Sequence, residues 1–306
     1  MGTTSFGIPG LDALSRAGHQ IVGIVSTPAR QKGRGLKIIE SDITLHAKEA
    51  GYEPVFCPQN LKSDHLVSDL KRLGADIFVV VAFRILPPEI FSIPEKGTYN
   101  VHASLLPRYR GPAPIQRALA AGETETGITV FRIDRGIDTG TIVLQRKTGI
   151  GDQETTPALS ARLALLGAEG ICEAVSLIQN SSVVFAAQDA TQATPAPKLT
   201  KSEGKIVWDT PARTLYNTIR AFTPFPGTYS FVNGQRFAVE WAMPVVDPGN
   251  AREDPGTVLS VVPDGFDVQC RASVLRVMTV RPEGKKSMGG RDFAMGRNIG
   301  KGTRLE

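Results

Sequence analysis

The first two-thirds of the chain alternates short apolar runs with amphipathic stretches. Amphipathic stretches at residues 9–17, 41–50 and 64–73 each precede a glycine and therefore predict helices, with Ser41 and Asp64 as N-terminal caps. Apolar runs at 20–26, 54–56 and 77–82 predict strands between these helices. The run 77–82 has no polar position, which is typical of a parallel strand covered on both faces.

The alternation continues with predicted strands at 98–103, 127–133 and 141–147 and predicted helices at 113–121 and 159–179. This order predicts an α/β fold with a doubly wound, mostly parallel sheet. Such a domain normally opens on a strand, but residues 1–9 have the composition of a loop that enters a helix. We therefore expect that the first strand is missing from this sequence, because the true start lies upstream of Met1 or the sequence is truncated.

The pattern changes after a polar, proline-containing segment at residues 187–204, which predicts a linker. One predicted helix at 210–221 is followed by short β-rich runs at 228–232, 237–241, 256–262, 266–270 and 274–280. The dipeptides Asn233-Gly234 and Asp264-Gly265 between such runs indicate hairpins. We expect a first domain at 1–186, the linker at 187–204, and a small OB-like β-barrel at 205–306.

Composition indicates a globular protein, with 306 residues, 41% of them apolar and 21% charged. The sequence shows no apolar run long enough for a membrane span, no signal segment and only three distant cysteines, so we expect a cytoplasmic protein. The net charge is +5, and residues 271–306 hold nine Lys and Arg against three acids, a local +6. Residues 27–39 contain four basic residues and no acid. These two basic segments are either solvated faces or contacts for a phosphate backbone.

Candidate chemistry lies at the ends of two predicted strands. Asn100 and His102 are two apart on one strand, so both side chains share a face near its carboxyl end, where open α/β sheets place their sites. Asp138 lies between the next two strands, where its alternative role is to stabilise a turn. An amide can donate to an oxyanion, an imidazole can shuttle a proton, and a carboxylate can orient the ring. Since no Ser or Cys nucleophile and no metal-ligand spacing is evident, the pattern favours direct acyl transfer without a metal.

Longer motifs around these residues resemble the methionyl-tRNA formyltransferase family. The resemblance is carried by Asn100-Val-His-Ala-Ser-Leu-Leu-Pro-Arg-Tyr-Arg-Gly111, Gly136-Ile-Asp-Thr-Gly140, Lys32-Gly-Arg-Gly35, Ile219-Arg-Ala-Phe222 and Gly284-Lys-Lys286. It implies a Rossmann-like formyltransferase domain, a C-terminal tRNA-binding domain, and transfer of the formyl group of 10-formyltetrahydrofolate to the α-amine of methionyl-initiator-tRNA. The Asn, His and Asp set is shared by all enzymes that use this folate on this fold. The tRNA assignment therefore rests on the basic loop and the C-terminal domain.

The resemblance also implies roles for individual residues, together with a monomeric protein that needs no metal and no membrane. The catalytic set is Asn100, His102 and Asp138. The folate-binding residues are Ser104, Leu105, Leu106, Pro107, Arg84 and Leu86, with the pterin between these loops and the Asp138 loop. The residues that contact the acceptor stem are Lys32, Arg34 and Lys37. Arg84 stands where many family members have glycine.

Three other functions share part of this pattern. A formyltransferase acting on an amino-sugar nucleotide shares the catalytic set and sometimes the C-terminal barrel, but the basic loop at 32–35 argues against it. Glycinamide ribonucleotide formyltransferase normally lacks that barrel, and the regulatory domain of formyltetrahydrofolate hydrolase is not visible here. An RNA-binding protein on an inactive enzyme scaffold would fit the missing strand, but not the intact catalytic set.

Overall fold

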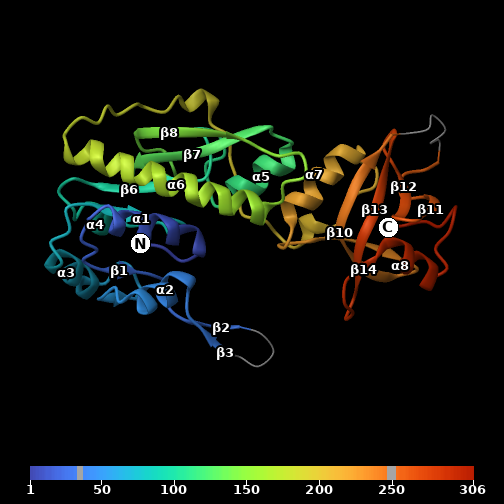
Figure 1. Cartoon of the computed structure of the whole chain (residues 1–306), viewed down its shortest axis with the longest axis horizontal. Helices are drawn as coiled ribbons and strands as arrows, with labels where there is room; N and C mark the ends of the chain where they lie inside the picture. The colour runs from blue at the N-terminus through green and yellow to red at the C-terminus, as the bar shows by residue number, and fades with distance from the viewer. Residues whose placement is uncertain (33–36, 247–252) are drawn as a thin grey trace. The chain divides into compact units, whose positions relative to one another are not determined.

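The chain folds into two compact units, which we describe separately from a computed structural model (Figure 1). The structure describes residues 1–32, 37–246 and 253–306, without the side chains of Lys32 and Lys37. The first unit comprises Met1–Pro114, Glu125–Gly149 and Ser160–Pro197. The second comprises Ile115–Thr124, Ile150–Leu159 and Lys198–Glu306.

The first unit is an α/β structure whose elements follow the predicted order. Its strands are β1 (Ile24–Val25), β2 (Arg30–Lys32), β3 (Lys37–Ile39), β4 (Val55–Phe56), β5 (Phe78–Val80), β6 (Thr98–His102), β7 (Glu125–Arg132) and β8 (Ile142–Gly149). Its helices are η1 (Ser5–Gly7), α1 (Ile8–Arg16), α2 (Asp42–Ala50), α3 (Asp64–Arg72), α4 (Pro88–Phe91), η2 (Ala190–Gln192) and most of α6 (Thr156–Gln179). Helix α6 covers β6, β7 and β8, because Gly167 and Gly170 approach apolar side chains of those strands.

The main sheet of this unit has the order β5-β6-β7-β8. Figure 1 shows β6, β7 and β8 beside helix α6. Strands β5 and β6 are parallel, whereas β6–β7 and β7–β8 are antiparallel. The sheet is therefore mixed, not mostly parallel as the sequence pattern predicted. The physical reason is clearest for β7 and β8, which are joined only by the loop 133–141. A connection this short cannot cross over the sheet, so the two strands must run antiparallel.

The predicted strand at 20–26 is much shorter in the structure, where β1 spans only Ile24–Val25 and pairs in parallel with β4. On its other side, Gly2 donates from its backbone N–H to the Val25 carbonyl at 3.0 Å and forms a parallel bridge with Val81. Met1 and Gly2 thus lie between β1 and the β5 side of the main sheet. The rest of the predicted strand has no strand partner on this side among the described residues.

Helix ends follow the predicted capping chemistry with one exception. Ser41 accepts a hydrogen bond from the Thr44 N–H at the start of α2, and Gly51 ends that helix at φ +74°. Helix α3 begins one residue after its cap, which is Ser63 and not Asp64 as predicted. Asp64 is instead the first helical residue, where its charge complements the helix dipole. Within the described ranges, no helix is long and apolar enough to cross a membrane.

The second unit is a mostly antiparallel β structure. Its strands are β9 (Thr228–Val232), β10 (Gln235–Val245), β11 (Val258–Val262), β12 (Gly265–Cys270), β13 (Ser273–Pro282) and β14 (Met288–Gly289). Its helices are nearly all of α5 (Pro114–Ala121), then η3 (Ser202–Gly204), α7 (Ala212–Phe222) and α8 (Gly290–Gly296). The sequence pattern did not predict β14 or α8.

The strands of the second unit pair along the path β11-β12-β13-β10-β9, with β14 beside β13. Asn233 and Gly234 connect β9 and β10 with φ angles of +50° and +72°, as the hairpin signal predicted. The core contains Trp208 together with Phe237, Phe266 and Phe293. Closure of this path into an OB-like barrel stays a prediction, because these pairings leave β11 and β9 at its two ends.

Candidate active site

Strand β6 carries two of the three candidate catalytic residues. It lies between β5 and β7, so its backbone is held on both sides. Asn100 and His102 alternate with Val101 and share one side of the strand. Asn100 is partly exposed, and no hydrogen bond to its side-chain amide is found among the described residues. His102 is deeper, with a side chain that is only 7% exposed.

The loop after β7 brings Asp138 to His102. Asp138 Oδ2 lies 3.7 Å from His102 Nδ1, and its side chain is 15% exposed. The same oxygen accepts a hydrogen bond from the Gly111 N–H at 2.8 Å. The Asp138 backbone has φ +53°, a left-handed conformation that costs free energy for a residue with a side chain. The Asp138 carboxylate is thus oriented by Gly111, which is distant in sequence, and this is expected of a residue that belongs to a site.

A second aspartate performs the turn function that was the alternative for Asp138. Asp134 Oδ1 accepts from the Gly136 N–H at 3.0 Å and from the Thr139 hydroxyl at 2.7 Å. This is the local side-chain to backbone pattern that aspartate forms in turns. Asp138 therefore does not serve as the turn residue of its own loop.

The hydrogen bonds of His102 indicate which nitrogen carries its proton. Nε2 lies 2.9 Å from the Tyr109 carbonyl oxygen, which can only accept, so this nitrogen is the donor. Nδ1 then faces Asp138, at a distance too long for a direct hydrogen bond. A proton that reaches Nδ1 would lie next to the carboxylate, which suits a group that passes a proton on.

Gln188 fixes the two loops around His102 to each other. Its side-chain amide donates to the carbonyls of Asp138 at 2.9 Å and Gly140 at 2.8 Å. Its side-chain oxygen accepts from the Arg110 guanidinium at 3.1 and 2.7 Å. Gln188 lies in the segment that the sequence predicted as a linker, and no sequence signal marks it, because its partners are mainly backbone carbonyls.

The loop that follows His102 is fixed by side chains of β7 and β8. The Leu106 N–H donates to Thr129 Oγ1 at 3.0 Å, and the Gln145 amide donates to the Leu106 carbonyl at 2.8 Å. Ser104 is fully buried and donates to the Arg108 carbonyl at 2.7 Å, so its hydroxyl is used within the protein. Leu106 is also buried, whereas Leu105 and Pro107 are partly exposed.

Arg84 and Leu86, predicted to bind folate, line a separate pocket of about 580 Å³. Two guanidinium nitrogens of Arg84 donate to the Pro58 carbonyl at 2.8 Å and the Gln59 carbonyl at 3.2 Å. Its Nε is buried and finds no partner among the described residues. Burial also lowers the pKa of this guanidinium. Arg135 of the Asp138 loop lines the same pocket, but residues 104–107 are not among the described residues that do.

The three residues predicted to bind tRNA belong to the hairpin of β2 and β3. Backbone pairing joins Arg30 to Ile39 and Lys32 to Lys37. Arg34 and the side chains of Lys32 and Lys37 lie outside the described residues. Ile38 is 73% exposed on the described part of this hairpin.

In the second unit, several basic residues of the segment 271–306 are paired with acids. Arg271 contacts Asp209, and Arg276 contacts the largely buried Asp267. Lys285 and Lys286 are exposed and have no acidic partner among the residues that the structure describes. Free positive charge is thus left where β13 ends.

Comparisons with known proteins agree on one family. Residues 1–175 match the formyl transferase family and residues 198–298 its C-terminal domain. The methionyl-tRNA formyltransferase of Geobacter metallireducens is 38% identical over all of this chain and 97% of its own length. That of Anaeromyxobacter dehalogenans is 40% identical over 97% of this chain and 95% of its own.

Solved structures share the fold at lower identity. An N-formyltransferase from Helicobacter canadensis, solved with folinic acid and dTDP-3-aminofucose, has a TM-score of 0.67 at 17% identity and covers 90% of this chain and 97% of its own. HypX from Aquifex aeolicus with tetrahydrofolic acid has a TM-score of 0.59 at 17% identity, covering 81% of this chain and 43% of its own. On the full-length similarity to its relatives, the chain belongs to the methionyl-tRNA formyltransferase family.

Proposed function

We propose that Asn100, His102 and Asp138 are the catalytic residues with which the chain, as a member of the methionyl-tRNA formyltransferase family, transfers the formyl group of 10-formyltetrahydrofolate to the α-amine of methionyl-initiator-tRNA. The observation that carries the proposal is the approach of Asp138 to His102 from a separate loop, at 3.7 Å, with the carboxylate oriented by Gly111. We propose further that the protein acts as a monomer in the cytoplasm and needs no metal.

Asn100 would stabilise the developing negative charge. When an amine adds to a formyl carbon, the carbonyl oxygen becomes an oxyanion, and a preorganised amide N–H next to it lowers the barrier. The Asn100 amide is partly exposed on the same side of β6 as His102, and it has no hydrogen bond among the described residues that would compete for it. Removal of one such donor typically costs about 10²–10³ in kcat.

His102 and Asp138 would move the proton that the reaction releases. The attacking amine becomes positively charged as its bond to the formyl carbon forms, so it must lose a proton before the folate nitrogen leaves. The Nδ1 of His102 can accept this proton, next to the Asp138 carboxylate, and return it to the departing nitrogen. Nε2 stays bonded to the Tyr109 carbonyl and holds the ring in place. Atoms balance, because the proton lost by the amine is the proton gained by tetrahydrofolate.

The pocket at Arg84 and Leu86 would hold the folate ring. A cavity of about 580 Å³ is within the usual size range of a small-molecule site. Leu86, Pro87 and Phe91 give it apolar walls, which suit a flat heterocycle. The buried Nε of Arg84, which has no hydrogen-bond partner among the described residues, adds a polar atom to this pocket. We propose that Arg84 mainly shapes the pocket, because its other nitrogens hold the loop at residues 58–59.

The hairpin of β2 and β3 and the end of β13 would contact the tRNA. Phosphate contacts by Lys and Arg supply most of the sequence-independent affinity for a nucleic acid. In the sequence Arg34 falls between β2 and β3, outside the described residues, while Lys285 and Lys286 form an exposed pair after β13. Ile38 on the same hairpin is exposed and could pack against an unstacked base.

The first experiment measures formyl transfer to charged initiator tRNA by Asp138→Asn and Asp134→Asn. These aspartates lie on one loop, but only Asp138 faces His102, so Asp134→Asn is a matched control. We expect kcat to fall by about 10²-fold or more in Asp138→Asn and by no more than a few-fold in the control. Equal activity of the two variants would refute the catalytic assignment. Transfer to an amino-sugar nucleotide but not to tRNA would refute the proposed substrate.

The tRNA contacts are tested by Arg34→Ala and by the double change of Lys285 and Lys286 to alanine. The control is Lys71→Ala, an exposed lysine at the end of α3. We expect a raised KM for tRNA, a weaker salt dependence of binding, and an unchanged KM for the folate. A loss of folate use equal to the loss of tRNA use would mean that these residues are structural.

A further inference from the structure

Two residues of the candidate site have strained backbones. Tyr109, whose carbonyl accepts from His102 Nε2, has φ +61°, and Asp138 has φ +53°. In a residue with a side chain this left-handed conformation costs free energy, and it persists only where the surrounding structure holds it. The two residues lie in separate loops, so each loop needs a support.

Both supports come from one segment, residues 188–196, which lies within the predicted linker. At its start, the Gln188 side chain donates to the Asp138 carbonyl at 2.9 Å. Six residues later, Thr194 Oγ1 accepts from the Tyr109 N–H at 2.8 Å. One short stretch of chain thus contacts the backbone of both strained residues.

The neighbours of Gln188 allow only one orientation of its side chain. The Arg110 guanidinium can only donate, so the atom that faces it must be the Gln188 oxygen. The NH₂ group then faces the carbonyls of Asp138 and Gly140, which can only accept. A rotated amide would place donors against donors and acceptors against acceptors. The contact of Gln188 with the Asp138 loop is therefore specific to an amide side chain.

The backbone of the same segment pairs with the loop that follows β6. Arg110 donates from its N–H to the Thr194 carbonyl at 2.9 Å and accepts from the Ala196 N–H at 2.6 Å. At the next position, a Cβ added to Gly111 would lie 2.6 Å from the Ala196 carbonyl oxygen, so this close approach requires glycine. Gly111 is also the donor to the Asp138 carboxylate. The segment therefore fixes the loop that orients this carboxylate.

We propose that the segment 188–196 positions the two catalytic side chains that move the proton. Gln188 positions Asp138 by holding the backbone of its loop. Thr194 positions His102 by holding the loop whose carbonyl accepts from Nε2. Both act through other residues of the site, and a misplacement of about 1 Å in such a site can cost about 10²-fold in rate. The inference rests on the proposed function, because only a catalytic pair needs this precision.

The first variant, Gln188→Leu, removes all four hydrogen bonds of the side chain at similar volume. Its matched control is Gln192→Leu, in the same segment, whose exposed amide donates to Asp189. We expect kcat for formylation of charged initiator tRNA to fall at least about tenfold in Gln188→Leu, with both KM values within about twofold. The control should keep its kcat within about twofold. Gln188→Glu, which keeps an oxygen for Arg110 but has no N–H for the carbonyls, should lose as much as Gln188→Leu, and full activity of this variant would overturn the proposal.

The Gly111 amide reports the position of the Asp138 carboxylate without any need for activity. Because its N–H donates to Asp138 Oδ2, its hydrogen exchange should speed up at least about tenfold in Gln188→Leu and stay unchanged in Gln192→Leu. Exchange at the amides of β6 and β7 shows whether the unit remains folded. A lower kcat with unchanged exchange at Gly111 would overturn the proposal.

The same change in an Asp138→Asn background separates positioning from general support of the fold. With no carboxylate to position, Gln188→Leu should lower kcat by less than about twofold further. A tenfold loss in both backgrounds would overturn the positioning role. Full activity of Asp138→Asn alone would instead refute the proposed function, so the two failures are distinguishable.

Thr194 is tested by a pair of variants that differ in the acceptor oxygen. Thr194→Val keeps the shape of the side chain but loses the acceptor for the Tyr109 N–H, whereas Thr194→Ser keeps it. We expect kcat to fall at least about fivefold in Thr194→Val and to stay within about twofold in Thr194→Ser. Equal kcat values for the two variants would overturn the role of Thr194 in positioning His102.

Discussion

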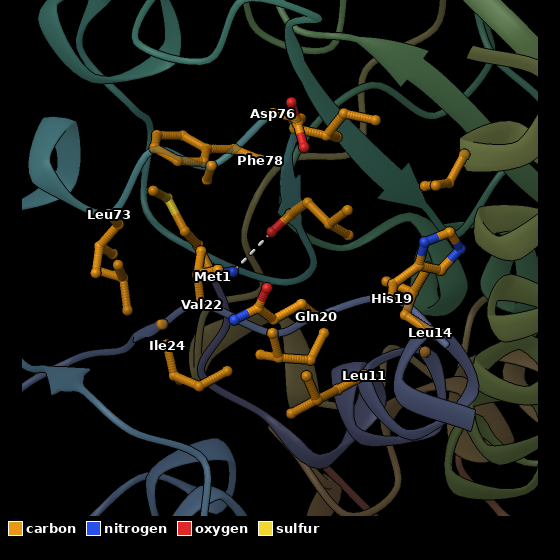
Figure 2. A pocket seen from close by; sticks show the side chains of 18 of the residues that line it. Met1, Leu11, Leu14, His19, Gln20, Val22, Ile24, Leu73, Asp76 and Phe78 are labelled. Atoms are coloured by element: carbon orange, nitrogen blue, oxygen red, sulfur yellow. Dashed lines mark hydrogen bonds between the residues drawn. The ribbon is translucent and has the colours of Figure 1, made fainter. Parts of the chain in front are cut away.

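The buried amine of Met1 predicts an unusual pH dependence of stability in the first unit. This amine lies at a groove of about 540 Å³ between β1 and β5 (Figure 2), and it donates to the Val79 carbonyl. It forms no ion pair with an acid among the described residues. Desolvation lowers its pKa from 8.0 to about 5. The perturbation is therefore a change of pH between 5 and 8.5, applied to the native chain and to a chain acetylated at the Met1 nitrogen. Acetylation keeps the N–H donor but removes the charge.

The sign follows from proton binding. Between pH 5 and 8 the unfolded chain holds a proton on this amine that the folded chain does not hold, so the free energy of unfolding rises with pH. The contribution is complete above pH 8, and it is lost as the pH falls toward 5. A shift of three pH units corresponds to about 4 kcal/mol. We expect less than this limit, about 2–3 kcal/mol, because Met1 is only partly buried and the groove admits water.

The assay is native-state hydrogen exchange of β1 and β5 amides, read at pH 5.5, 6.5, 7.5 and 8.5 on both chains. Comparison at equal pH cancels the intrinsic exchange rate and the titration of other groups, including His19 and Asp76, the titratable side chains among the residues that line the groove. Both tryptophans, Trp208 and Trp241, lie in the second unit. Their fluorescence therefore gives an internal control that acetylation should not change. Intact mass must first confirm that Met1 is retained.

We expect the two chains to be equally stable at pH 8.5, and the acetylated chain to become increasingly the more stable one as the pH falls below that value. A difference that stays constant from pH 8.5 to 5.5 would refute the titration argument, since acetylation would then act only by its volume. A native chain that is the more stable one at pH 5.5 would refute its sign.

Two further predictions concern packing, each with a matched control. Gly111→Ala should lower kcat for formyl transfer at least about tenfold, because its φ is +124° and a Cβ would lie 2.6 Å from a backbone oxygen. Gly51→Ala, with φ +74° and no described atom within 4 Å of the added carbon, should cost only about 1–2 kcal/mol of stability and leave kcat unchanged. Arg220→Leu should lower the free energy of unfolding in urea by about 3 kcal/mol, because the buried guanidinium donates to two loop carbonyls. Arg213, on the same helix, pairs with the exposed Asp152 and lies over the Tyr216 ring, as Arg220 also does, so Arg213→Leu should lower the free energy of unfolding by only about 1 kcal/mol. An equal fall in kcat for the two glycine variants, or an equal loss in the free energy of unfolding for the two arginine variants, would contradict these expectations.

Local chemistry could be predicted from the sequence where it depends on neighbouring residues. Ser41 and Gly51 mark the ends of α2, and Asn233-Gly234 marks a hairpin, because caps and tight turns need particular side chains or φ angles within a few positions. The direction of β7 and β8 depends on pairing over the whole sheet, which apolar runs do not encode. Helix α8 was missed because its packing residue, Phe293, contacts Phe237 far away in sequence.

The candidate site was predictable in its side chains but not in its supports. Asn100, His102 and Asp138 carry recognisable chemistry at strand ends. The groups that orient them are mostly backbone atoms, such as the Tyr109 carbonyl and the Gly111 N–H. Any residue type offers those atoms, so no pattern of side chains identifies them. Gln188 was hidden for the same reason, within a segment whose polar composition predicts a linker.

The interrupted sheet and the candidate site are linked through β5. Strand β6, which carries Asn100 and His102, has β7 on one side and β5 on the other. Strand β5 is itself held on its outer edge only by Met1 and Gly2 among the described residues, next to the open groove. Since a strand with one unpaired edge opens more readily than one paired on both edges, the groove determines how firmly β5 supports β6.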